Sequence, residues 1–73
     1  MKNIYGILQD LVFTRLMSGL ETKTIIIDSK SYDDLCAILD ITGRIDKINL
    51  IGKEIDIKTK VIFNDKTYIK LTD

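Results

Sequence analysis

Apolar residues recur at every second position through much of residues 48–71, and a period of two is the period of a β-strand. Gly52 and Lys53 separate two of these runs, and a Gly-X pair in such a place is typical of a two-residue type II′ hairpin. Folding the chain about this pair puts four apolar residues on one face of the two strands. The pairs are Ile48 with Ile57 and Leu50 with Ile55.

A second turn is predicted at residues 64–66, where Asn, Asp and Lys interrupt the alternation. A three-residue loop here pairs Val61 with Ile69, whereas a two-residue loop would expose Ile69, so the pattern favours the longer loop. The inner face then holds Ile57, Thr59, Val61, Phe63, Ile69 and Leu71. The C-terminal part of the chain is therefore predicted to form a three-stranded antiparallel meander.

Residues 3–18 have the period of an amphipathic helix, with Asn3 as the N-cap and Gly19 as the left-handed residue that ends it. The predicted core stripe is Ile4, Ile7, Leu8, Leu11, Val12 and Leu16. Phe13 and Met17 lie one turn apart on the opposite side. Such a pair is either plain surface or a contact with another chain.

Residues 22–28 are predicted to form a strand, and the unbroken apolar run at 25–27 is typical of a central strand. Ser29 and Ser31 offer N-caps for a second helix over residues 32–39. A strand, a helix and a returning strand usually form a right-handed parallel unit. We therefore expect the strand at 22–28 to run parallel to the strand that follows the second helix.

These elements predict one domain over residues 1–73 with a two-layer α+β fold in the order α-β-α-β-β-β. The expected architecture is a four-stranded mixed sheet with a C-terminal antiparallel meander and two helices on one face. The other face of the sheet would be open. Its residues are Lys47, Asn49, Ile51, Glu54, Asp56, Lys58, Lys60, Ile62, Tyr68 and Lys70, and Ile26 joins them.

This open face is too apolar for an ordinary solvated surface and too charged for a core. Ile51, Ile62 and Tyr68 are its predicted anchors, surrounded by a polar rim. Together with the pair on the first helix, it gives the predicted partner-binding residues. These are Ile51, Ile62, Tyr68, Phe13, Met17, Lys58, Lys60 and Lys70.

Composition adds constraints on location and origin. Basic and acidic residues cancel at 11 each, so no global charge indicates nucleic acid or an anionic membrane. A lone cysteine, Cys36, and the lack of a signal-peptide pattern or a long apolar run predict a cytoplasmic protein. Abundant isoleucine, lysine favoured over arginine and no proline indicate an AT-rich genome. A low-GC bacterium, or a phage or mobile element within one, fits these features.

The best enzyme-like feature is Asp28, which follows a buried strand and precedes a helix, a place where many α/β sites hold magnesium or phosphate. Asp33 and Asp34 are close in sequence. No glycine-rich loop, histidine or second strand-end carboxylate accompanies them, so the pattern favours a strand end and helix-start acids. The sequence predicts no catalytic residue, metal site, cofactor or small-molecule substrate.

The function that fits best is a small, non-catalytic interaction protein that binds a protein partner, itself, or both. The alternative is a winged-helix DNA-binding protein in which residues 42–51 form the recognition helix. In that alternative Asp46 and Asn49 would stand at normally apolar positions of the helix. Nucleic acid could also lie on the open sheet face, where lysines surround Tyr68 as a stacking platform.

Overall fold

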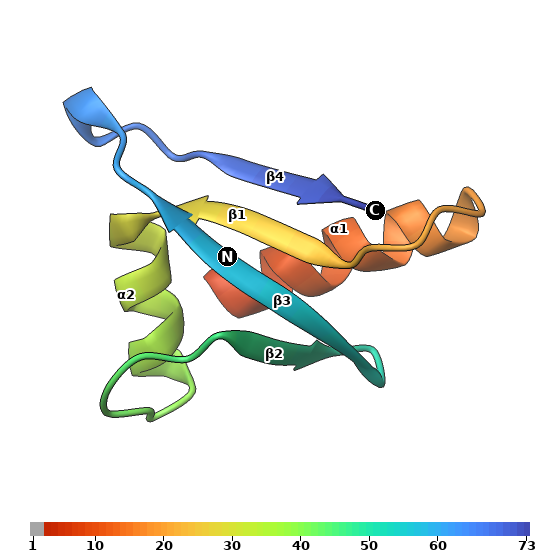
Figure 1. Cartoon of the computed structure of the whole chain (residues 1–73), viewed down its shortest axis with the longest axis horizontal. Helices are drawn as coiled ribbons and strands as arrows, with labels where there is room; N and C mark the ends of the chain where they lie inside the picture. The colour runs from red at the N-terminus through yellow and green to blue at the C-terminus, as the bar shows by residue number, and fades with distance from the viewer. Residues whose placement is uncertain (1–2) are drawn as a thin grey trace.

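The computed structural model describes residues 3–73, and Figure 1 shows its two helices and four strands. The order α-β-α-β-β-β is confirmed. The elements are α1 (Ile4–Met17), β1 (Thr24–Asp28), α2 (Ser29–Ile38), β2 (Lys47–Leu50), β3 (Lys53–Lys60), the 3-10 turn η1 (Phe63–Asp65) and β4 (Ile69–Thr72).

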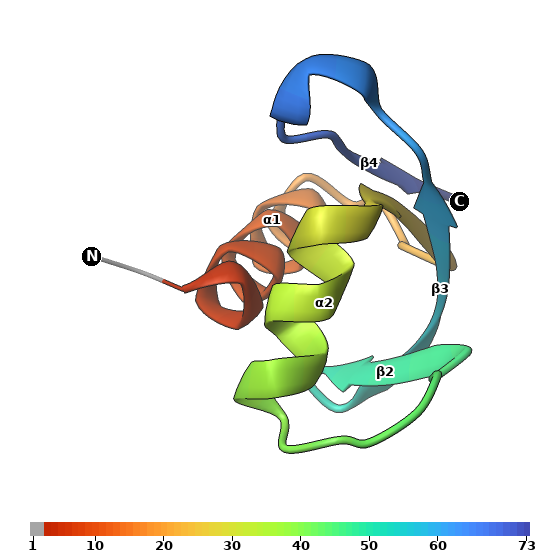
Figure 2. The same ribbon diagram turned by 90° about the vertical axis from the view of Figure 1, so that its left-hand side faces the viewer.

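The four strands form one mixed sheet in the order β2-β3-β1-β4. Figure 2 shows both helices on the same side of this sheet, which leaves the other side open. The molecule is therefore a two-layer α+β fold with both helices on one face, as predicted. The core lies between the layers, and its fully buried side chains are Leu8, Ile25, Ile27, Leu35, Leu50 and Ile55.

The central strand β1 holds the inner face of the sheet together. Its Ile25 lies between Ile57 of β3 and Leu71 of β4, and Ile27 lies between Thr59 and Ile69 in the next row. Cross-strand neighbours of this kind on one face are the unit of sheet stabilisation. The apolar run at 25–27 forms a central strand, as predicted, but within residues 3–73 the expected cover on both of its faces is absent, because both helices lie on one face and Ile26 is half-buried on the other.

The predicted C-terminal meander is wrong in its last strand. β4 pairs with β1 and makes no ladder with β3, because β3 already has β2 on one edge and β1 on the other. Residues 61–68 consequently cross from the end of β3 past β1 to the far edge of the sheet (Figure 1). Val61 and Phe63, expected on the inner face, lie on this crossover and are 71% and 82% exposed.

The predicted parallel unit is also corrected. β1 runs parallel to β3, and β2 is antiparallel to β3, so the strand directly after α2 opposes β1. The antiparallel strand β2 therefore comes between α2 and the parallel strand β3 in the chain, and β2 and β3 form a hairpin. The winged-helix alternative is contradicted as well, because Lys47–Leu50 of its recognition helix is a strand.

The hairpin between β2 and β3 forms with a shift of two residues from the predicted register. Ile48 faces Ile55 and Leu50 faces Lys53, so the turn residues are Ile51 and Gly52. An even shift keeps every side chain on its predicted face, and the inner face is as expected. Both turn residues have positive φ, 53° at Ile51 and 73° at Gly52, which is the backbone of a type I′ turn.

Ile51 is a poor residue for its place, because a β-branched side chain is strained in the left-handed region. We expect Ile51→Asn to raise the free energy of unfolding by about 1 kcal/mol, since asparagine tolerates this backbone and favours type I′ turns. Urea denaturation measures the change. The control is Gly52→Ala, which should destabilise because alanine at φ 73° is strained. A loss of stability in Ile51→Asn would contradict the assigned turn.

Candidate interaction surfaces

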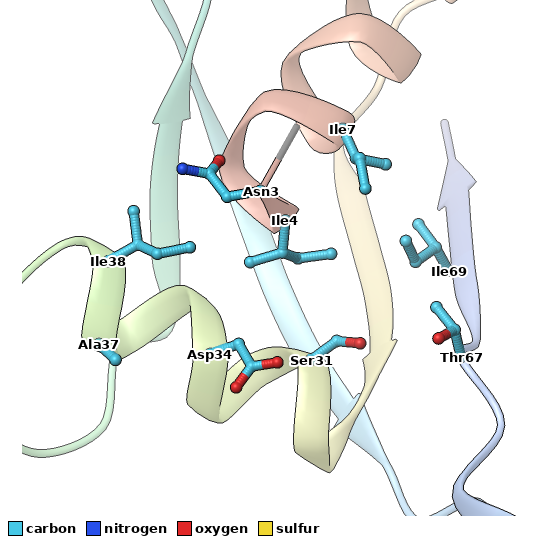
Figure 3. A pocket seen from close by; sticks show the side chains of 9 residues that line it. All are labelled: Asn3, Ile4, Ile7, Ser31, Asp34, Ala37, Ile38, Thr67 and Ile69. Carbon is cyan, nitrogen blue, oxygen red and sulfur yellow. The ribbon is translucent and has the colours of Figure 1, made fainter. Parts of the chain in front are cut away.

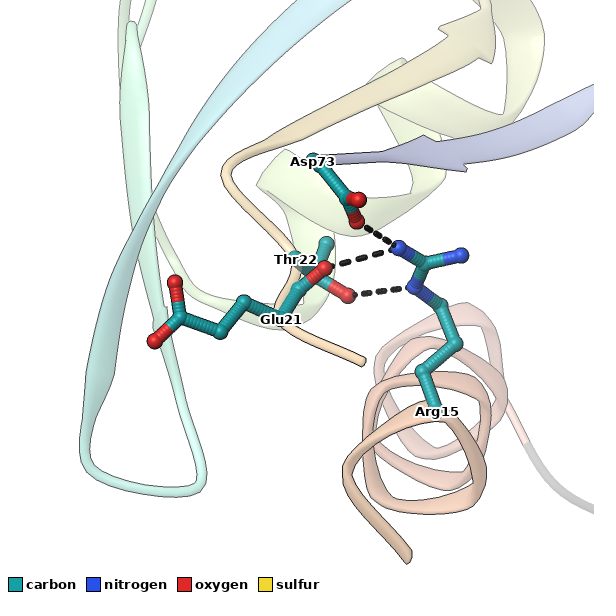
Figure 4. A network of polar contacts seen from close by, with 4 residues as sticks. All are labelled: Arg15, Glu21, Thr22 and Asp73. Atoms are coloured by element: carbon teal, nitrogen blue, oxygen red, sulfur yellow. Dashed lines mark hydrogen bonds and ion pairs between the residues drawn. The ribbon is translucent and has the colours of Figure 1, made fainter. Parts of the chain in front are cut away.

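Helix α1 is fixed at both ends by polar contacts. Asn3 caps its start, with Oδ1 accepting the backbone N–H of Gly6 at 2.9 Å. At the other end Arg15 donates through Nε to Thr22 Oγ1 at 2.9 Å and through its terminal nitrogen to the Glu21 carbonyl at 2.7 Å. The same nitrogen forms an ion pair with Asp73 (Figure 4). These contacts tie α1 to the start of β1 and the end of β4.

Despite this anchoring, α1 buries few of its apolar side chains. Only Leu8 and Val12 are fully in the core, and three expected core residues are exposed, Ile7 and Leu11 at 38% and Leu16 at 39%. Four exposed apolar residues gather at the C-terminal end of α1, three of them at i, i+3 and i+4 on the helix and the fourth just beyond its last turn, and we call them the α1 stripe. They are Phe13 at 52%, Leu16 at 39%, Met17 at 72% and Leu20 at 45% exposure.

Phe13 and Met17 are exposed, as predicted. The exposure of Leu16 and Leu20 was not predicted. The signal was present, because residues 4–17 carry only two charged side chains, Asp10 and Arg15. A helix that is apolar nearly all round is typical of one covered on more than one side.

A groove lies where α1, α2 and the start of β4 meet. It has a volume of about 520 Å³. Figure 3 shows Ile4 and Ile7 from α1, Ile38 from α2 and Ile69 from β4 around it. Asp34 is the charged residue of its wall. The complete lining is Asn3, Ile4, Ile7, Ser31, Asp34, Ala37, Ile38, Thr67 and Ile69.

The open face of the sheet is chiefly a charged surface. Lys47 Nζ lies 3.2 Å from Glu54 and 4.0 Å from Asp56. The hydrogen bond and charge of Glu54, with the charge of Asp56, raise the pKa of Lys47. In the adjoining row Ile26 stands between Lys58 and Lys70, their Cα atoms being register partners across β3, β1 and β4. Ile26 is half-buried there.

The three predicted anchors do not form one patch. Ile51 lies in the turn before β3, whereas Ile62 and Tyr68 lie beyond its other end, so about 25 Å of strand separates them. Ile62 and Tyr68 are half-buried. Lys60 Nζ lies 5.0 Å from the centroid of the Tyr68 ring and so occupies the aromatic surface that a stacked base would need. The predicted partner-binding residues are thus divided among α1, the open sheet face, the β2–β3 turn and the crossover.

Asp28 is a buried structural junction. One carboxylate oxygen accepts the backbone N–H of Ser31 at 2.9 Å and caps α2, and the other accepts the N–H of Tyr68 at 3.0 Å. Burial acts to raise the pKa of Asp28, but these hydrogen bonds outweigh it and the pKa lies below its usual value. The capping residue of α2 is therefore Asp28, in place of the predicted Ser29 or Ser31.

This arrangement uses both oxygens of Asp28 inside the protein. Asp33 and Asp34 are exposed on α2 and do not join it. Within residues 3–73, no group of three or more acidic, histidine or cysteine side chains is placed to hold a metal ion. Asp28 therefore acts as a helix cap and a tether for the entry to β4.

Tyr32 fastens the loop between α2 and β2. Its buried hydroxyl donates to the carbonyl of Ile45 at 2.9 Å and accepts the N–H of the same residue at 2.7 Å. Burial and the neighbouring Cys36 raise the pKa of Tyr32. Arg44 covers the ring at 5.8 Å from its centroid. The pair of hydrogen bonds sets where the chain enters β2.

Comparison of the chain with protein-family models, curated protein sequences and solved structures found no match. In the part of the chain that the structure describes, neither helix has the length and apolar character needed to span a membrane.

We expect Asp28→Ala to lower the free energy of unfolding by about 2–3 kcal/mol, because it removes a helix cap and leaves two backbone N–H groups without their partner. Asp28→Asn should cost less, since its one carbonyl oxygen can still accept. Urea denaturation at pH 7 measures both. The control is Asp33→Asn, an exposed acid on the same helix, which should change stability by under about 1 kcal/mol.

The pH dependence gives a second test of Asp28. Its pKa is lowered on folding, so the ionised carboxylate stabilises the protein above the unfolded pKa of about 3.9, and this stabilisation is lost as the pH falls through the folded value. The stability difference between the wild-type protein and Asp28→Asn should therefore shrink between pH 6 and pH 2. A constant difference would contradict the ionised junction.

Tyr32→Phe tests the fastening of the α2–β2 loop. The variant keeps the buried ring and removes only the hydroxyl, so the Ile45 N–H and carbonyl lose their partner. We expect a loss of about 1–3 kcal/mol. Faster amide hydrogen exchange at Ile45 should accompany it. Unchanged exchange at Ile45 would show that the hydroxyl does not hold this loop.

Proposed function

We propose that this protein is a small, non-catalytic interaction protein and that it associates with a second copy of itself through the α1 stripe. The observation that carries the proposal is the exposure of Phe13, Leu16 and Met17 on one side of α1, with Leu20 exposed just beyond its end. If a large side chain presents about 200 Å² when fully exposed, the stripe offers roughly 400 Å² of apolar surface. The largest apolar patch of a typical monomer has this size and is often functional.

Spacing and charge favour a second copy as the partner. Residues at i, i+3 and i+4 lie on one side of a helix, so the α1 faces of two copies related by a two-fold axis can pack against each other. The formal net charge is zero at pH 7, so two copies do not repel each other at long range. A standard interface buries about 800 Å² per partner, and the stripe would form its apolar centre within a polar rim.

A non-catalytic role agrees with the chemistry of the described residues. The carboxylate with the most enzyme-like position, Asp28, has both oxygens bonded to backbone N–H groups. The sequence holds no histidine, and its one thiol, Cys36, is buried. On composition we also propose a cytoplasmic location and an origin in a low-GC bacterium or in a phage or mobile element of one.

The test is the mass of the protein in solution. We expect sedimentation velocity to find a dimer or a larger assembly at micromolar concentration. The double variant Phe13→Glu/Met17→Glu should raise the dissociation constant of the stripe contact at least about 100-fold, because it buries two charges in an apolar interface. Both residues are exposed in the single chain, so the fold should persist, which circular dichroism checks.

The control is Thr14→Glu, which places one such charge on an exposed position of the same helix outside the stripe. It should leave the mass unchanged. Equal masses for the wild-type protein and Phe13→Glu/Met17→Glu across the concentration range would refute association through α1.

A further inference from the structure

Phe63 is the most exposed large apolar side chain of the described chain, at 82%. It stands on η1, in the crossover that carries the chain from β3 to β4, and Figure 2 shows this crossover leaning over the helix side of the sheet. Neighbouring Asn64 has φ 73°, a left-handed residue that turns the backbone sharply at this point. A phenylalanine held on such a turn is costly in water, and burying it elsewhere would be favourable.

The groove between α1, α2 and β4 provides a surface of matching chemistry. Its apolar walls come from three elements, with Ile4 in the middle, Ile38 on α2 and Ile69 on β4 (Figure 3). A volume of about 520 Å³ is large enough to admit an aromatic ring together with part of its backbone. The groove also begins close to the crossover in the chain, because Thr67 in its wall follows Phe63 by four residues.

Charge is complementary between the two features. Lys66 is exposed on the crossover, three residues after Phe63, and Asp34 is exposed in the wall of the groove. An aromatic side chain with a nearby lysine is complementary to an apolar groove with a nearby carboxylate. The chain carries both of these surfaces.

We propose that Phe63 of one copy docks in the groove of a second copy, with Lys66 of the first near Asp34 of the second. Since the crossover and the groove are neighbours on each copy, a two-fold axis passing between them lets the contact form twice in one dimer. The partner is thus a second copy, whose crossover and groove are identical to those of the first. The exposure of Phe63 is explained by the contact that covers it.

This crossover contact is independent of the α1 stripe, because none of the four stripe residues lines the groove. A chain with both contacts forms an assembly larger than a dimer, and each contact can be removed without the other. The two proposals therefore predict different masses for the same set of variants.

The test is sedimentation velocity on Phe63→Ser in the wild-type chain and in the Phe13→Glu/Met17→Glu chain. In the latter chain only the crossover contact remains, so we expect a dimer. Phe63→Ser should raise the dissociation constant of this dimer about 30-fold. Phe63→Leu, which keeps an apolar side chain, should retain most of the association. If instead Phe63→Ser leaves the mass unchanged in both backgrounds, the crossover contact is refuted while the α1 stripe is not.

A charge exchange identifies the groove as the docking surface. Asp34→Lys and Lys66→Glu should each raise the dissociation constant of the remaining dimer about two- to fivefold. The double variant should restore the original dissociation constant. No rescue in the double variant would refute docking of Phe63 beside Asp34. A protein in which NMR shows Phe63 buried at every concentration down to the monomer would also refute it, because the ring would then occupy the groove of its own chain.

Discussion

The structure depends on the position of β1 between β3 and β4. Residues 25–27 are three consecutive isoleucines, and such a run is stable only where strands lie on both edges and a helix layer covers at least one face. Once β3 occupies one edge of β1, the other edge is filled by β4. Since β3 has β2 on its remaining edge, the chain after Lys60 must pass β1 before it can rejoin the sheet. The crossover follows directly from this requirement.

Three polar contacts hold the elements around this strand. Asp28 joins the end of β1 to α2 and to the residue before β4, so the helix and the far edge strand meet at one carboxylate. Tyr32 holds the entry to β2, and Arg15 ties α1 to Thr22, just before β1, and to Asp73, just after β4. Each contact links segments far apart in sequence, which matters in a chain whose core contains few fully buried side chains. Because these groups are already bonded within the protein, they serve stability more than chemistry.

The exposed apolar surface follows from the small size of the sheet. A sheet of four short strands covers one side of two helices, and α1 has apolar residues at more positions than the sheet can cover. The crossover likewise leaves Phe63 82% exposed. Two separate apolar surfaces on a chain of 73 residues and zero net charge are typical of a protein that completes its core by association. The open face of the sheet is mostly charged, with the acids Glu54 and Asp56 beside Lys47 and the half-buried Ile26 between Lys58 and Lys70.

The sequence by itself determined the local features. Asn3 and Gly19 set the ends of α1, and the alternation of apolar residues fixed which side of each strand faces the helices. The sequence could not determine which strands pair, because Ile69 and Leu71 point to the inner face whether β4 lies beside β3 or beside β1. The same ambiguity hid the shift of the hairpin by two residues, since an even shift changes no face. Only the tertiary structure decided these partners, because β3 has two edges and β2 and β1 occupy both. That competition for edges sent residues 61–68 past β1 and left Phe63 outside the core.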